Sequence, residues 1–180
     1  MILATMCGSA DPRSSNAVLL AAAVGSLPSG TEVREVGPLT AVPGFEPGSA
    51  GGDSVGAMRA ALDGADGLVI ATPEYAHSVP GVVKNALDWL VGTGELATMP
   101  IVLLSASPLI TGGINAQIAL TRTLLAQGGE VVATLTVPES KRKIVDGAVA
   151  HEPTRRRAAE TMQAIIDVIT ERAELTGEHA

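Results

Sequence analysis

The sequence contains very few aromatic residues and almost no cysteine. Its 180 residues include one Trp, one Tyr, one Phe and one Cys. With so few rings on which bases could stack, and with a formal net charge of -7, the chain lacks the usual features of a nucleic-acid-binding protein. The single cysteine, Cys7, cannot form an internal disulfide, which fits a reducing compartment.

Long hydrophobic runs and targeting signals are also missing. No apolar run approaches the roughly 18 residues that span a membrane. The first residues, MILATMCGSADP, lack the positively charged start of a signal peptide. The chain has no Cys/His cluster with metal-ligand spacing. We therefore expect a cytoplasmic protein without a metal site that binds neither membranes nor nucleic acid.

The sequence does contain an alternation of apolar strands and amphipathic helices within one predicted domain, residues 1–180. Hydrophobic residues make up 46% of the chain, enough for a sizeable core. Strands are predicted at residues 2–6, 33–36, 68–71, 101–104 and 131–137, with helical spacing between them. This alternation predicts an α/β fold, a three-layer sandwich around a parallel five-stranded sheet in the flavodoxin-like order 2-1-3-4-5.

Two further segments are predicted from composition and periodicity. Residues 139–153 are expected to form a polar loop, followed by a final amphipathic helix around residues 158–169. Residues 37–52 are rich in Gly and Pro and predict a long loop, which could cover a site or fray.

The first strand is followed by the segment CGSADPRSSN, which leads into a helix starting near Ser15. Gly8 permits a tight turn, and hydroxyl groups together with the open N–H groups of a first helical turn can bind a phosphate. Arg13 could add a charged contact, whereas Asp11 would oppose an anion. The alternative is that Ser14 or Ser15 only caps the helix. The turn matches neither the dinucleotide fingerprint nor the P-loop, so a terminal monophosphate suits it better.

The third strand is followed by the segment TPEYAHSVPGVVKNALDWL, residues 72–90. Its Pro and Gly spacing predicts an extended loop and then a helix with Pro80 near its first turn. Backbone groups left unpaired in such a loop could bind the edge of a planar ring. The alternative is a structural loop whose prolines only set its path. In the helix, Lys84 and Asp88 are spaced to pair across one turn.

The fourth strand is followed by SASPLITGGINAQ, another Ser- and Gly-containing loop that leads into a helix. The loops after strands one, three and four should meet at the carboxyl edge of the sheet, where open α/β sheets bind ligands. A mononucleotide could span them, with its phosphate at the first loop and its ring at the other two.

These residues resemble the NAD(P)H-dependent FMN reductases of flavodoxin-like fold, which include quinone, azo and chromate reductases. The resemblance covers roughly residues 2–138. It is carried mainly by PEYAHSVPGVVKNALDWL, and SASPLITGG is similar to the family's third loop. The chain departs from the family at Asp11, where an arginine is usual, and at Ala76, where an asparagine is common.

The resemblance implies an FMN site at the three loops. The phosphate would lie at the first loop, the isoalloxazine ring at the second, and the ring's polar edge near the third. The residues expected to bind the cofactor are Ser9, Arg13, Ser14, Ser15, Asn16, Pro73, Glu74, Tyr75, Ala76, Ser105, Ser107 and Gly112.

The resemblance also implies an oxidoreductase that passes hydride from NAD(P)H through FMN to a small acceptor such as a quinone or a flavin. Such chemistry requires no catalytic acid or base from the protein. A homodimer or homotetramer is implied, with the helix at residues 80–90 near the subunit contact. Two alternatives remain: a non-enzymatic electron carrier like flavodoxin, and a module that has lost its flavin and acts through a partner.

Overall fold

A five-stranded parallel sheet forms the centre of the molecule, of which the computed structural model describes residues 1–177. The strands are β1 (Ile2–Cys7), β2 (Glu32–Val36), β3 (Gly67–Ala71), β4 (Pro100–Ala106) and β5 (Glu130–Val137). They lie in the order β2-β1-β3-β4-β5, and each adjacent pair is parallel. The predicted fold class and strand order are confirmed, and each predicted strand lies inside an observed one.

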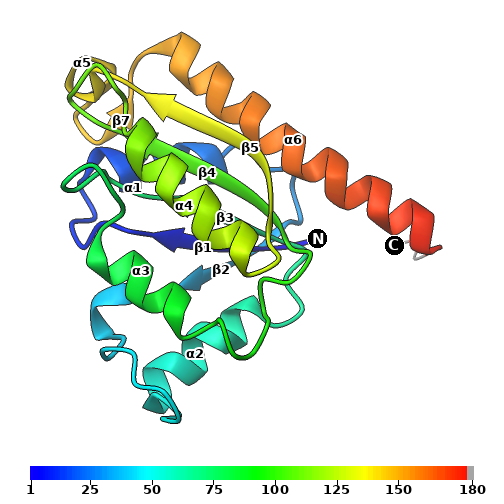
Figure 1. Ribbon diagram of the computed structural model, residues 1–180. Coiled ribbons are helices and arrows are strands. Elements are labelled where there is room, and N and C mark those ends of the chain that lie inside the picture. Colours follow the sequence, from blue (N-terminus) through cyan, green and yellow to red (C-terminus); the bar gives the residue numbers. More distant parts are fainter. Residues whose placement is uncertain (178–180) are drawn as a thin grey trace.

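Helices cover both faces of the sheet (Figure 1). They are α1 (Ser15–Val24), the short 3₁₀ helix η1 (Leu39–Ala41), α2 (Gly52–Leu62), α3 (Gly81–Asp88), α4 (Ile114–Ala126), α5 (Ser140–Lys143) and α6 (Glu152–Thr176). Helices α1 and α6 pack on one face, and α2, α3 and α4 pack on the other. Because both faces are buried, the central strands are continuous apolar runs rather than alternating ones.

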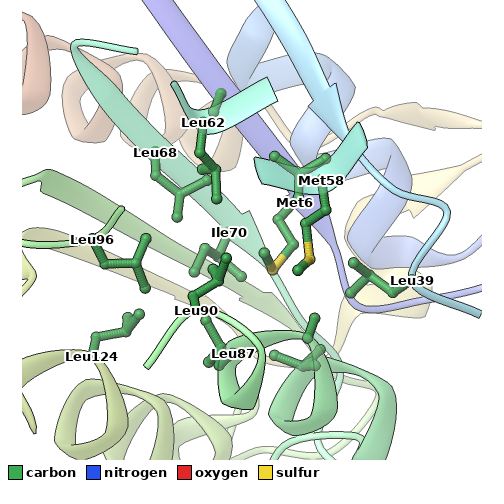
Figure 2. Close-up of a cluster of buried hydrophobic side chains, with 14 of the residues drawn as sticks. Met6, Leu39, Met58, Leu62, Leu68, Ile70, Leu87, Leu90, Leu96 and Leu124 are labelled. Atoms are coloured by element: carbon green, nitrogen blue, oxygen red, sulfur yellow. The ribbon is translucent and has the colours of Figure 1, made fainter. Parts of the chain in front are cut away.

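The core under α2, α3 and α4 is built from aliphatic side chains and methionine, as the scarcity of aromatics requires. Figure 2 shows Met6 of β1 beside Met58 of α2 and Leu39 of η1, with Ile70 of β3 at the centre of the cluster. All four are buried. Their burial holds the helices against the sheet.

The predicted polar loop at residues 139–153 is wrong in part. It contains α5 and a small antiparallel pair, β6 (Ile144–Val145) with β7 (Ala148–Val149). Strands of two residues are too short to show a periodicity. The signal that could have identified them is Asp146-Gly147, which joins them with positive φ at both residues (49° and 74°), as a type I′ hairpin turn requires.

The predicted loop at residues 37–52 contains η1, and its Gly52 is the first residue of α2. Asn85 of α3 accepts a hydrogen bond from the Phe45 N–H (2.8 Å) and donates one to the Pro43 carbonyl (2.9 Å). The indole Nε1 of Trp89 donates to the same carbonyl (2.8 Å), and the ring of Phe45 meets Trp89 edge to face at 5.2 Å. The loop is therefore held against α3 rather than frayed.

Candidate functional site

The first loop ends at an N-terminal helix cap. The Ala17 N–H donates to Ser14 Oγ (3.1 Å), so Ser14 is the N-cap of α1, one of the two predicted cap residues. The backbone N–H groups of Ser15 and Asn16 have no hydrogen-bond acceptor within the described chain. These two amides lie at the positive end of the helix dipole, an arrangement that favours an anion.

Asp11 and Arg13 are paired within this loop. Asp11 Oδ1 accepts hydrogen bonds from the Arg13 backbone N–H (2.9 Å) and from its Nε (3.5 Å), and the Asp11 N–H donates to Ser9 Oγ (3.3 Å). The Arg13 N–H is the main reason that the pKa of Asp11 lies below its usual value. The carboxylate that would oppose an anion is thus turned toward its own loop and accompanied by a cation.

The side chain of Asn16 makes its hydrogen bonds within the protein. Its Nδ2 donates to the Ala106 carbonyl (3.0 Å), and its Oδ1 accepts from the Ala106 N–H (2.8 Å). Asn16 is buried, and these bonds fasten the start of α1 to the end of β4. Its backbone N–H, by contrast, makes no hydrogen bond within the described chain and is open to a ligand.

The third loop is shaped by its serines. Ser105 is fully buried and its Oγ donates to the Gly112 carbonyl (2.9 Å), while Ser107 Oγ accepts from the Leu109 N–H (3.2 Å). Gly113 has φ of 92°, and a Cβ there would lie 1.8 Å from Ser105 Oγ. Both serines support the path of the loop, and Gly113 is required where the loop passes over Ser105.

The second loop is a tight hairpin turn. Tyr75 and Ser78 exchange two backbone hydrogen bonds of 2.9 Å, and the two residues between them, Ala76 and His77, have φ of 49° and 58°. This matches the type I′ turn, which requires positive φ at both central residues. The amides of Glu74 and Ala76 make no hydrogen bond within the described chain. The loop therefore does present open backbone groups, although fewer than an extended loop would.

The carboxylate of Glu74 lies against the N-terminus of α4. It accepts hydrogen bonds from the backbone N–H groups of Asn115 (2.9 Å) and Ala116 (3.3 Å) and from Asn115 Nδ2 (3.0 Å), and His77 Nδ1 lies 3.3 Å away. Burial alone would raise the pKa of Glu74, but these hydrogen bonds outweigh it and lower the pKa below its ordinary value. Asn115 was not predicted as a site residue, because its partner lies 41 positions away in the sequence.

The first and second loops are also in close contact. The Gly8 N–H donates to the Ala71 carbonyl (2.7 Å), and a Cβ on Gly8 would lie 2.6 Å from Val83 Cγ2 and 2.9 Å from Thr72 Oγ1. A larger residue at this turn would push the two loops apart. Asn16 joins the first loop to the end of β4, and Glu74 joins the second loop to the start of α4. Together with the contact at Gly8, these hydrogen bonds hold the three predicted loops at one edge of the sheet.

A cavity of about 500 Å³ opens beside the first loop, between α1, the edge strand β2 and η1. Ser9 and Pro12 line it at the loop, and Cys7 and Glu35 line it over the sheet. Burial is the main cause of a raised pKa of the Cys7 thiol, with the Glu35 carboxylate adding to it. A protonated thiol is a poor nucleophile, which agrees with a packing role for Cys7.

The described residues, 1–177, contain no group of three or more His, Cys, Asp or Glu side chains that could hold a metal ion. Among the described helices, none is long and apolar enough to cross a membrane.

Comparison with known proteins identifies relatives of this chain. The model of the NADPH-dependent FMN reductase family matches residues 1–142, which include every predicted site residue. A quinone reductase of Escherichia coli strain K12 is 40% identical over 74 residues, which cover 40% of this chain but only 39% of that protein's length. An NAD(P)H-dependent FMN reductase of Pseudomonas aeruginosa is 33% identical over 129 residues, which cover 66% of each chain.

A solved structure shares the fold over nearly the whole chain. FerB, a flavoenzyme NAD(P)H:(acceptor) oxidoreductase from Paracoccus denitrificans, matches with a TM-score of 0.80 at 24% identity, covering 94% of this chain and 97% of that one. At this identity the likeness shows a common fold. It agrees with the flavodoxin-like architecture predicted from the sequence.

Proposed function

Because this chain belongs to the NADPH-dependent FMN reductase family, we propose that it is an NAD(P)H-dependent oxidoreductase that binds FMN at the three loops. Its electrons would pass to a small-molecule acceptor such as a quinone or a flavin. The observation that carries this proposal is the meeting of three ligand-type loops at one sheet edge, with open backbone amides in the first and second loops. The residues present therefore fit a mononucleotide.

The phosphate of FMN would be held at the start of α1. The open amides of Ser15 and Asn16 supply N–H donors there, and the hydroxyls of Ser9 and Ser14 lie in the same loop. Helix α4, which also begins at this edge, is less suited because the Glu74 carboxylate already accepts from its first amides. Arg13 would add positive charge once it shifts from Asp11 toward the phosphate.

The ring of FMN would lie along the second loop, with its polar edge toward the third. Pro73, Glu74, Tyr75 and Ala76 would line the ring mainly through backbone groups. Three residues of the third loop would act by giving that loop its shape: Ser105, Ser107 and Gly112. Bound FMN supplies hydride acceptance and electron transfer, so the chain's own task is to bind, orient and exclude water.

The test is a titration of the purified apo chain with FMN, followed by NADH or NADPH oxidation with a quinone present. We expect quenching of FMN fluorescence and flavin-dependent oxidation of the nicotinamide. FMN binding without any NAD(P)H oxidation would favour the electron carrier, and no FMN binding would favour the module that has lost its flavin.

The variant Asp11→Asn tests the position of the phosphate. It keeps an oxygen that can accept from the Arg13 N–H but removes one exposed negative charge. If the phosphate lies at this loop, FMN should bind about two- to fivefold more tightly at low salt, with less difference at high salt. Glu139→Gln, which changes an exposed carboxylate paired with Arg142, should leave FMN affinity unchanged. Equal affinity of Asp11→Asn and wild type at every salt concentration would contradict this placement.

We further propose a homodimer formed through the outer face of α4. Ile110, Ile114, Ile118 and Leu125 are 85%, 42%, 47% and 58% exposed, and the last three follow helical spacing along one stripe. Tyr75, in the second loop, is 59% exposed. A stripe of this kind on a helix favours a partner surface. Helix α3, near which the subunit contact is expected, covers the same face of the sheet as α4 (Figure 1).

NAD(P)H is an intracellular reductant, so we propose that the protein acts in the cytoplasm. Cell fractionation would test this, and recovery outside the cytoplasmic fraction would contradict it.

A further inference from the structure

Glu74 supplies a cap to a helix that has none of its own. The N-cap of α4 is Gly113, which has no side chain to accept from the first helical amides. The Glu74 carboxylate takes this role from a loop 41 residues earlier, accepting from the N–H groups of Asn115 and Ala116. Its side chain is only 7% exposed, so these bonds compete little with water.

This carboxylate connects two of the three loops. Its second oxygen accepts from Asn115 Nδ2 (3.0 Å), and the same Nδ2 lies 3.3 Å from His77 Nδ1. Within the described chain, every side-chain hydrogen bond between residues 73–79 and 107–117 belongs to this group. The group thus determines how far the hairpin turn lies from the start of α4.

We propose that Glu74 is a positioning residue that holds the second and third loops at the separation required by a planar ring, and that its carboxylate does not itself contact the ring. The identity of the ring as that of FMN rests on the proposed function. The link between the loops rests only on the contacts above, and therefore can be measured without any ligand.

An exchange of donor and acceptor tests the link. In Glu74→Gln one carboxylate oxygen becomes an NH₂ group that faces N–H donors, so at least one bond is lost. In Asn115→Asp two carboxylates face one another. In the double variant Glu74→Gln/Asn115→Asp, the new Gln amide can donate to the new Asp carboxylate, and its oxygen can still accept from the backbone.

Two quantities are measured for each variant. They are the FMN dissociation constant and the rate of amide hydrogen exchange at positions 115 and 116 in the apo protein. Losing one hydrogen bond to a charged group should raise the dissociation constant about tenfold in Glu74→Gln. Asn115→Asp should weaken binding further, and the double variant should return to within about threefold of wild type. Both amides should exchange faster in the single variants and recover in the double variant. Glu160→Gln, which opens the exposed pair with Arg156 on α6, should change neither quantity.

Several outcomes would overturn the proposal. One is a double variant that binds FMN no better than Asn115→Asp. Another is Glu74→Gln with faster exchange but unchanged FMN affinity, which would make Glu74 a helix cap only. If wild type binds no FMN, the proposed function fails, but amide exchange at positions 115 and 116 still tests the link between the second and third loops. Unchanged exchange in the single variants rejects the link. Faster exchange in the single variants that is restored in the double variant supports it.

Discussion

At the carboxyl edge of the sheet, most polar side chains hold the protein's own backbone. Asn16 binds the main chain of Ala106, Ser105 binds that of Gly112, and Glu74 binds that of α4. Within residues 1–177, the backbone amides of Ser15 and Ala76 are among the groups at this edge that make no hydrogen bond. A site of this kind depends on the positions of loops, so variants of the supporting side chains should alter ligand affinity indirectly.

Ala76 occupies a backbone conformation that suits glycine or asparagine better. Its φ of 49° in the I′ turn costs an alanine about 1 kcal/mol. We expect Ala76→Gly to raise the free energy of unfolding by about 0.5–1 kcal/mol, measured by urea denaturation. Ala10→Gly, in an exposed loop without positive φ, is the control and should leave stability equal or lower. A less stable Ala76→Gly would contradict the assignment of this turn.

The lowered pKa of Glu74 predicts how its contribution to stability depends on pH. A carboxyl whose folded pKa lies below its unfolded value of about 4.3 stabilises the protein fully above that pH, and the contribution is lost as pH falls through the folded pKa. Glu74→Gln should therefore cost about 1–3 kcal/mol at pH 7 and progressively less below about pH 4. Urea denaturation of both proteins at pH 7, 5 and 3.5 measures this difference. A difference that grows between pH 5 and pH 3.5 would be inconsistent with the hydrogen bonds described.

At the scale of elements, α3 joins the second loop to the long loop before α2. Val83 packs under Gly8 at the beginning of this helix, while Asn85 and Trp89 hold residues 43–45. Within the segment of residues 72–90, several side chains after Pro80 therefore serve to support neighbouring loops. The predicted pair of Lys84 and Asp88 is confirmed at 2.5 Å on the exposed side of the same helix.

Removing the amide of Asn85 should release the long loop. Asn85→Leu loses the bonds to Phe45 and Pro43, and we expect a cost of about 1–2 kcal/mol together with faster proteolysis within residues 43–50. Asp88→Asn is the matched control on the same helix, and opening its pair with Lys84 should cost less than about 0.5 kcal/mol. Urea denaturation and limited proteolysis measure both variants. Equal proteolysis of Asn85→Leu and wild type would show that the loop is held by other contacts.

At the scale of the whole molecule, burial is complete along the central strands β3 and β4 but incomplete on α4. The inner side of this helix packs Leu120 and Leu124 into the core, while Ile114, Ile118 and Leu125 remain exposed. A helix with apolar residues on two sides has more hydrophobic surface than one core can cover. The surplus is what the proposed homodimer would bury.

The variant Ile118→Lys tests this surface. A lysine in the centre of a dimer interface would bury an unpaired charge, so we expect light scattering to give the mass of a single chain for Ile118→Lys and twice that mass for wild type. Val145→Lys replaces an exposed apolar residue on β6 and should remain dimeric. A monomeric wild type, or a dimeric Ile118→Lys, would contradict the proposed interface.

Much of this fold follows from local patterns in the sequence. Short apolar runs separated by helical spacing predict the five strands and their order, because βαβ crossovers have one hand and require helices on both faces. Glycine, proline and serine at the ends of three strands locate the three loops that the structure places at one edge of the sheet. The pair β6 and β7 was missed because its strands have two residues each and produce no periodicity.

The sequence by itself determined the α/β class, the strand order, the family and the three loops. Only the tertiary structure decided what the side chains in those loops do. Asn16 meets Ala106 across 90 positions, and Glu74 meets Asn115 across 41, and no local pattern encodes such distant partners. Hydrogen bonding is short-ranged and directional, so the role of a polar residue depends on which group the fold brings within about 3 Å of it.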